Sequence, residues 1–347
     1  MKILLYSLFL AVLSVIVIGF LWFIADRPNK SPNHFQRVFI ERGPGASQRE
    51  SLPDNVGGPI GGMSDSVFFS TDEPGRVIIT DSKFKKKGEV LFHLPGSLKD
   101  SIKQNFFSRF DAPWIYFCAY NIPAIICCNI YTHQVSVYYK TGTAFTNVCP
   151  VSEDRFLFRQ LDYKSKDQVF SLRDTRHSLP VKESSLYTPY GDGGLISGGN
   201  LHYEKKTGIF NYTFVYGNKI MLFDTGLNII RIQHTIDTFT LPVLKSGRLG
   251  KVTYSNLGPA RRINHLTCIS QKFLFVNSLV KADNEDAGIF NNNTVIDIYD
   301  LDTLRYRGSF YMPRLDRQYI SSMQVVNKSL IAFYKNEAVV HSLDFLN

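Results

Sequence analysis

A short pattern recurs six times along the chain and constrains its fold more than any other feature. Each copy is an alternating run of apolar residues, usually ended by an acidic residue and followed by a polar turn. The copies are RVIITD (76–81), QVSVYY (134–139), QVFSLRD (168–174), KIMLFD (219–224), TVIDIYD (294–300) and AVVHSLD (338–344). Their first apolar residues lie 58, 34, 51, 75 and 44 positions apart, about 52 on average. This spacing is typical of propeller blades, so the pattern predicts six sheet units.

Each copy lies within a series of strands. β-branched and aromatic residues alternate with polar ones there, and Gly, Asn and Asp clusters mark the turns. The clearest expected strands are 195–203, 209–216, 219–223 and 229–236 in the fourth unit, and 263–270, 272–280, 294–299 and 306–312 in the fifth. After residue 25 the only expected helix is a short surface one, at 97–105. Four-stranded units repeated six times predict an all-β, six-bladed β-propeller, favoured over an irregular β-sandwich.

The amino terminus has a different character. Residues 3–25 carry no formal charge, and 16 of them are Leu, Ile, Val or Phe. A helix of that length spans roughly 35 Å, enough to cross a hydrocarbon core of ~30 Å. The run is longer than the apolar region of a signal peptide and lacks a small-residue cleavage site. Residues 1–25 are therefore predicted to be an uncleaved transmembrane signal anchor, rather than a signal peptide that is removed.

The anchor must connect to the ring. Residues 26–33 are the expected linker, and residues 34–347 the propeller. The last copy ends without a fourth strand, and an isolated strand, HFQRVFIER (34–42), precedes the first blade. Closing a ring pairs such open edges, so residues 34–42 are predicted to complete the sixth blade as its outermost strand. Positive flanks alone favour a cytoplasmic body, but a terminus of two residues favours export, so an extracytoplasmic (in bacteria, periplasmic) body is expected.

With the repeat and the anchor in place, a family resemblance follows. An apolar amino terminus joined to sheets such as NTVIDIYDLDTLRYRGSFYMP (293–313) resembles the six-bladed, TolB-like propellers of bacterial envelopes. The resemblance covers roughly residues 34–347 and carries no catalytic residues. It implies architecture and an envelope location only. The chain departs from the commonest members in lacking the Cys of a lipoprotein.

Several chemistries are excluded or disfavoured by inspection. The chain has no G-x-S-x-G, no phosphate-binding loop, no H-E-x-x-H and no C-x-x-C, so no catalytic set, metal site or cofactor is predicted. The five Cys lie mostly in apolar runs, where a free Cys is a small hydrophobe. The carboxylates of DNEDAG (283–288) could hold calcium, but a solvated hairpin tip is favoured. KFKKKGE (83–89) is expected to be a charged outer turn rather than a lipid contact, and no nucleic-acid module accompanies the net charge of +9.

The candidate ligand-binding residues are polar side chains on expected innermost strands and the loops leading into them. Equivalent positions from separate blades converge on the central channel of a propeller, where several cations could bind one anionic or sugar-like ligand. These residues are Arg109, Asn200, His202, Arg262, His265 and Arg317. The same arginines could instead bond only to carbonyl groups at the channel mouth.

Two functions remain open from the sequence. The favoured one is a membrane-anchored, non-catalytic module that binds a protein partner or a small anionic or carbohydrate ligand at one face of the ring. The alternative is an envelope hydrolase or lyase acting on carbohydrate or peptide, with His202 or His265 as general base. The alternative requires one of these histidines to lie within hydrogen-bond reach of an acid inside one pocket.

Overall fold

The fold is taken from a computed structural model of the chain. It describes residues 2–25, 32–40, 48–139, 144–177, 179–240, 245–249, 252–256, 261–315, 318–335 and 337–346.

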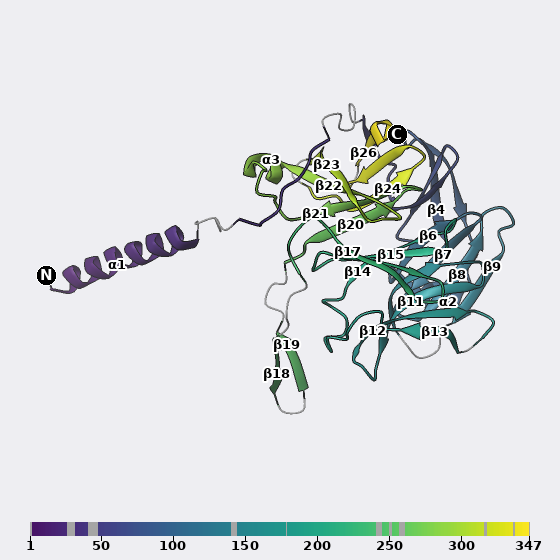
Figure 1. The fold of residues 1–347 in the computed structure, drawn as a ribbon, viewed down its shortest axis with the longest axis horizontal. Coiled ribbons are helices and arrows are strands. Elements are labelled where there is room, and N and C mark those ends of the chain that lie inside the picture. The colour runs from purple at the N-terminus through teal and green to yellow at the C-terminus, as the bar shows by residue number, and fades with distance from the viewer. Residues whose placement is uncertain are drawn as a thin grey trace.

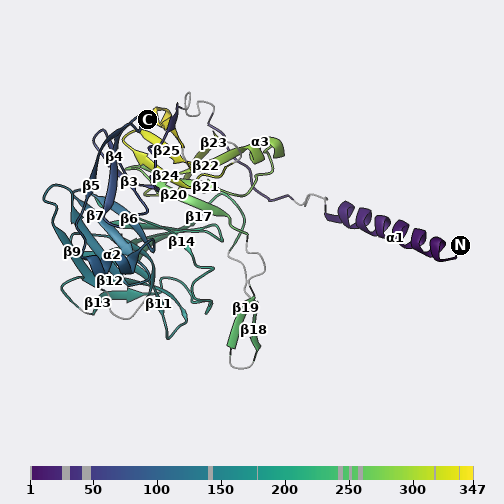
Figure 2. The same cartoon turned by 180° about the vertical axis from the view of Figure 1, so that it is seen from behind.

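Six four-stranded antiparallel sheets are arranged as blades around a common axis (Figures 1 and 2). The predicted six-bladed β-propeller is therefore confirmed. The strands, from the innermost outward, are β2 (Pro59–Met63), β3 (Ser66–Ser70), β4 (Arg76–Asp81) and β5 (Lys86–Leu91) in blade 1; β6 (Phe106–Asp111), β7 (Trp114–Ala119), β8 (Ala124–Asn129) and β9 (Val135–Tyr139) in blade 2; β10 (Phe145–Pro150), β11 (Arg155–Asp162), β12 (Asp167–Asp174) and β13 (Pro180–Ser184) in blade 3; β14 (Gly199–Glu204), β15 (Ile209–Phe214), β16 (Lys219–Asp224) and β17 (Ile229–His234) in blade 4; β20 (Asn264–Ile269), β21 (Phe273–Ser278), β22 (Asn293–Asp300) and β23 (Tyr306–Pro313) in blade 5; and β24 (Ser322–Val326), β25 (Ser329–Phe333), β26 (Glu337–Ser342) and β1 (Gln48–Ser51) in blade 6.

The repeated pattern falls on the third strand of every blade except the second. In blade 2 the copy QVSVYY lies on β9, the fourth strand, and the third strand is β8. The sequence of β8, AIICCN, has no acidic ending and is buried at five of its six positions. This strand packs against a neighbouring blade on both faces, so it shows no polar alternation. Because the copy in blade 2 lies on the fourth strand and not the third, the spacing before it is long, at 58 residues, and the spacing after it is short, at 34.

The ring is closed by β1, and the prediction that residues 34–42 close it is wrong. β1 pairs antiparallel with β26, with Arg49 opposite Val339. Residues 32–40 instead lie on blade 5, where Phe39 bridges Ser309 of β23, and residues 41 and 42 lie outside the described residues. β1 was missed because an outermost strand is largely exposed, and its sequence QRES carries no apolar pattern.

The apolar core is divided among the six interfaces between adjacent blades. On β7, Ile115 and Phe117 pack toward blade 1, whereas Tyr116 and Cys118 pack toward blade 3. Alternate side chains of one strand thus serve two different interfaces. All five cysteines are buried and free, as their apolar surroundings indicated.

Helices are few in the described part of the chain. They are α1 (Lys2–Ala25), α2 (Gly96–Ile102), α3 (Ala287–Asn292) and a 3₁₀ turn, η1 (Asp344–Leu346). In α1 the described side chains are those of Tyr6, Ser7 and residues 9–21. Within the described residues, no helix is both long and apolar enough to cross a membrane. The short helix expected at 97–105 is α2, which buries Leu98 and Ile102.

The segment 32–40 is fixed to blade 5 through one buried arginine. Arg37 donates to both carboxylate oxygens of Asp297, at 2.8 and 3.2 Å, and to Glu285. It also donates to Ser278 Oγ at 2.7 Å and to the carbonyl of Val280 at 3.0 Å. An isolated buried charge is costly, so its docking between two carboxylates explains why this segment lies on blade 5.

The DNEDAG loop takes part in the same docking. Asp283 accepts hydrogen bonds from the backbone amides of Asn33 and His34, and Asn284 bonds both the amide and the carbonyl of Arg37. The loop is therefore an attachment site for the amino-terminal segment. The sequence predicted a solvated hairpin tip here and missed this role, because the contact joins residues 250 positions apart.

The lysine-rich turn behaves as the sequence indicated. Its residues lead into β5, the outer edge of blade 1. Lys86 pairs with Glu89 at 2.7 Å, and Lys87 with Asp65 at 3.1 Å. Phe84 is buried between blades 1 and 6, so the turn is held by its aromatic residue while its charges stay in solvent.

Candidate functional site

A cavity of about 430 Å³ lies on the propeller axis. All six innermost strands line it, which identifies it as one end of the central channel. Its walls include the last residues of β6, β10 and β20, so it opens at the end of the ring where the first and second strands of these blades are joined. This volume is in the range of small-molecule sites. Of the six predicted residues, Arg109 and His202 line it.

Arg109 supplies one of the two positive charges on the cavity wall; the other, Lys205, is paired with Asp111 at the mouth. One nitrogen, Nη2, donates to Asn147 Oδ1 on β10 at 2.8 Å, and the guanidinium lies 5.8 Å from the ring centre of Phe107. Nε is buried and has no partner among the described residues. Nη1 makes no hydrogen bond within the described residues and is not buried. The guanidinium of this cavity-lining residue therefore has two nitrogens, Nε and Nη1, without a partner among the described residues, and a fork of donors suits a carboxylate or phosphate.

His202 stands on β14 and faces blade 5. Its Nε2 lies 2.7 Å from the hydroxyl of Thr267 on β20. Burial, with a smaller contribution from the positive charge of Arg109, lowers the pKa of His202 to about 4. The imidazole is therefore neutral at pH 7, and it offers the cavity a neutral polar group rather than a second cation.

Two more polar groups in the cavity have no partner. Ser108 Oγ and Gln324 Oε1 are buried without a hydrogen bond among the described residues. At the mouth, Lys205 pairs with Asp111 at 3.0 Å, joining blades 4 and 2. Both of those side chains are partly in solvent, so the pair contributes little to stability, on the order of 0–1 kcal/mol. The unsatisfied groups inside are those expected of a site completed by a polar molecule.

The other predicted residues lie toward the opposite end of the channel. Asn200 donates to the carbonyl of His265 at 3.2 Å, about 7 Å along the strands from the His202–Thr267 contact. Arg262 is exposed before β20, and burial, more than the charge of Arg262, lowers the pKa of His265. Arg317 lies outside the described residues. The predicted set is thus divided between two ends, and no single site contains it.

The amino-terminal segment reaches the ring at that opposite end. β20 ends in the cavity and β21 returns from it, so the β21–β22 loop lies at the far end of blade 5. Asn33 donates to Lys281 and Asp283 of this loop, and its carbonyl accepts from Thr238 in the β17–β20 connection. The segment 32–40 therefore joins the ring at the end that is remote from the cavity.

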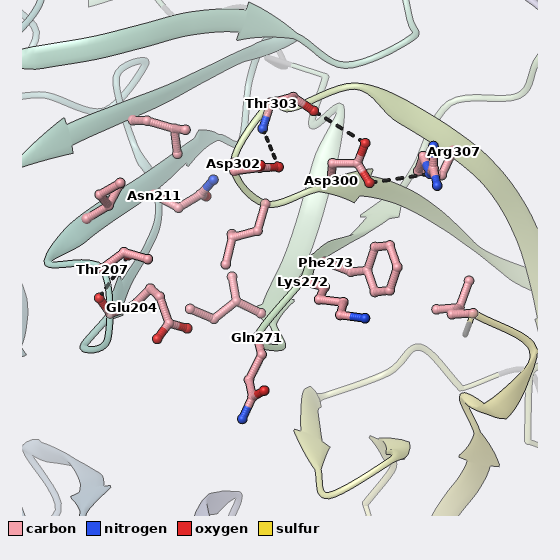
Figure 3. Close-up of a pocket in the computed structure, with 15 residues that line it drawn as sticks. Glu204, Thr207, Asn211, Gln271, Lys272, Phe273, Asp300, Asp302, Thr303 and Arg307 are labelled. Atoms are coloured by element: carbon pink, nitrogen blue, oxygen red, sulfur yellow. Dashed lines mark hydrogen bonds and ion pairs between the residues drawn. The ribbon is translucent and has the colours of Figure 1, made fainter.

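A second, larger cavity was not predicted. It has a volume of about 640 Å³ and lies between blades 4 and 5 (Figure 3). Asn211 on β15 and Phe273 on β21 line it, with Asp300 and Arg307 at its edge. The one signal in the sequence was Asn211 itself, a polar residue in the middle of a strand whose other positions are apolar or aromatic but for Thr213.

Comparison with known proteins places the fold and no more. Neither a family model nor a curated protein matches the sequence. Among solved structures, a member of the DUF4221 family from Bacteroides vulgatus is 14% identical, with a TM-score of 0.54, covering 90% of this chain and 98% of that one. A streptogramin B lyase structure is 12% identical, with a TM-score of 0.51, covering 86% and 98%. The predicted resemblance to six-bladed propellers is confirmed at the level of the fold.

Proposed function

We propose that this protein is a membrane-anchored binding module that holds a small anionic or carbohydrate-like acid in the channel cavity. The observation that carries the proposal is Arg109, whose Nε and Nη1 lack partners among the described residues inside a pocket lined by all six blades. A bidentate charge-assisted contact with a carboxylate is the strongest interaction that such a fork can make. Ser108 and Gln324 would complete the contacts to hydroxyl groups of the ligand.

The anchor in this proposal is α1. Residues 3–25 carry no formal charge, and described apolar side chains on different sides of the helix are exposed, Val15 and Ile18 by more than half. A helix that exposes apolar groups all round needs an apolar environment, which a bilayer provides. In this proposal the body lies on the extracytoplasmic side. Because the segment 32–40, which follows the anchor, is attached at the far end of the ring, the cavity faces away from the bilayer.

A hydrolase or lyase is not supported by the geometry. A general base on this scaffold would need a histidine paired with an acid, and the imidazoles of His202 and His265 make no hydrogen bond or ion pair to a carboxylate among the described residues. A pKa of about 4 also makes His202 a weak base at neutral pH. A protein partner is the remaining alternative, in which case the anion would be a side chain of that partner.

Isothermal titration of the full-length protein in detergent with glucuronate and with inorganic phosphate tests the proposal. Arg109→Gln should weaken glucuronate binding at least tenfold, because it removes the charge and the fork. Arg231→Gln, an exposed arginine on β17, is the matched control and should leave binding unchanged. Equal binding in the Arg109 variant, or no binding of either anion to the wild type, would refute a channel site for anions.

A further inference from the structure

The cavity between blades 4 and 5 is distinct in character from the channel. Three turns surround it, joining β14 to β15, β20 to β21 and β22 to β23 (Figure 3). Its inner surface is more apolar than polar, in contrast to that of the channel cavity, and its volume is typical of a pocket for a small molecule. The apolar lining consists of Ile209, Leu222, Ile269, Phe273, Leu301 and Leu346.

One polar side chain reaches this surface from the core. Asn211 is only 2% exposed and stands in the middle of β15, opposite Leu222 of β16. Its Oδ1 accepts a hydrogen bond from Thr213 at 3.2 Å. With the amide in this orientation, Nδ2 has no partner among the described residues and points into the cavity (Figure 3). A buried donor without an acceptor is costly and rare, so it indicates a partner that enters the cavity.

The charges at the rim favour an uncharged partner over an anion. Asp300 is paired with Arg307 at 3.3 Å and accepts from Thr303. Of the other charged groups on the lining, Glu204 and Asp302 are negative and Lys272 is positive, and none of the three forms an ion pair among the described residues. The rim therefore carries an excess of negative charge, unlike the channel with its open arginine.

We propose that this cavity between blades 4 and 5 binds a small, uncharged and largely apolar molecule whose carbonyl oxygen accepts a hydrogen bond from Asn211 Nδ2. The apolar lining contacts the body of the molecule, and the single donor fixes its orientation. This site is independent of anion binding in the channel.

Three probes of nearly equal shape test which ligand the cavity prefers. Acetophenone has a carbonyl group, cumene has a methyl group in place of the carbonyl oxygen, and benzoate carries a negative charge. Ligand-observed NMR with the full-length protein in detergent gives the three dissociation constants. The double variant Asn211→Leu/Thr213→Val removes the Nδ2 donor together with the Thr213 hydroxyl that donates to Asn211 Oδ1. In this variant the preference for acetophenone over cumene should fall by about fivefold, the equivalent of one neutral hydrogen bond.

Stability separates a ligand-binding Asn211 from a structural one. Replacing both hydrogen-bonded groups by apolar residues of similar shape removes the unpartnered donor, so the thermal midpoint of the double variant should equal or exceed that of the wild type. Thr207→Trp, in the turn at the mouth, should block acetophenone. The matched Thr132→Trp, in an exposed turn of blade 2, should not.

Four results would overturn the proposal. They are an unchanged acetophenone preference in the double variant, tightest binding of benzoate, undiminished acetophenone binding in the Thr207 variant, and binding of an apolar peptide when none of the three probes binds. An acetophenone affinity lost in Arg109→Gln would assign the probe to the channel instead. Failure of glucuronate binding alone would leave this cavity's assignment intact, since the hydrogen-bond donors of the two sites, Asn211 and Arg109, are different residues.

Discussion

Loss of the Arg37 side chain should weaken the protein more than loss of any exposed arginine. The guanidinium and the Glu285 carboxylate have no exposed surface, and the Asp297 side chain is 2% exposed. In Arg37→Met both carboxylates stay buried and lose their cation. Breaking a buried ion pair from one side costs about 3–5 kcal/mol, because the remaining charge is left without compensation. We therefore expect the free energy of unfolding to fall by about that amount.

Urea unfolding of the full-length protein in detergent, followed by circular dichroism, measures the loss. The control is Arg49→Met, which removes an exposed pair with Glu337 on the closing strand and should cost at most about 1 kcal/mol. Because the segment 32–40 can detach before the ring unfolds, trypsin cleavage after Arg42 gives a second reading. Cleavage there should be faster in the Arg37 variant than in the control.

A rescue variant separates lost charge pairing from lost packing. Adding Glu285→Gln and Asp297→Asn to Arg37→Met neutralises the two buried carboxylates, so part of the stability should return. If the Arg37 variant is no less stable than the Arg49 variant and trypsin cleavage is unchanged, Arg37 does not hold the segment 32–40 on blade 5. A triple variant that is less stable than Arg37→Met alone would also contradict the reasoning.

Three other predictions follow from burial and topology. His341 is 2% exposed, neither ring nitrogen has a partner among the described residues, and burial lowers its pKa to about 4. As the pH drops, the unfolded chain binds the proton before the folded one, so the free energy of unfolding falls between about pH 6.5 and 4, by at most about 3 kcal/mol from this residue. In urea titrations His341→Leu should make the free energy of unfolding depend less on pH over this range. An unchanged pH dependence would contradict a buried, neutral His341. Burial raises the pKa of Cys118 and Cys128 to about 12, so a thiol reagent at pH 8 should label five cysteines in urea and none in the native protein, and rapid native labelling would contradict their burial. A fluorophore on Ile289→Cys in α3 should be quenched by headgroup-nitroxide lipid more than one on Lys206→Cys at the cavity end, and equal quenching would refute the proposed orientation.

Much of the architecture could be predicted because blade strands carry local signals. The expected strands of blades 4 and 5 fall within a few residues of β14–β17 and β20–β23. Their third strands are buried on both faces and end at Asp224 and Asp300, whose carboxylates accept backbone amides or hydroxyls in the turns that follow. A turn that needs such an acceptor leaves a visible mark in the sequence.

The strand that closes the ring, β1, and the docking of the segment 32–40 on blade 5 could not be predicted, for two different reasons. β1 is exposed, so selection for apolar residues does not act on it. Arg37 is buried, but its partners Glu285 and Asp297 lie far along the chain, and nothing in a single sequence pairs them. The candidate sites show the same limit. Arg109 and His202 of the channel cavity were named, whereas Asn211 of the cavity between blades 4 and 5 was not, because a lone polar residue inside a strand is normally satisfied locally.

The interface between blades 4 and 5 is unlike a purely apolar one. Polar contacts cross it where His202 meets Thr267 and where the backbone amide of Ile236 donates to the hydroxyl of Tyr299. The interface also contains the cavity with the unpartnered Nδ2 of Asn211. The chain between these two blades also contains the hairpin of β18 (Lys245–Leu249) and β19 (Val252–Asn256), and its Thr238 contacts Asn33 of the segment 32–40. Its length accounts for much of the 75-residue spacing, the largest between repeats. Departures from an optimal apolar core persist where function compensates for their cost. The widest interval in the repeat therefore marks the interface at which we expect this propeller to bind its uncharged ligand.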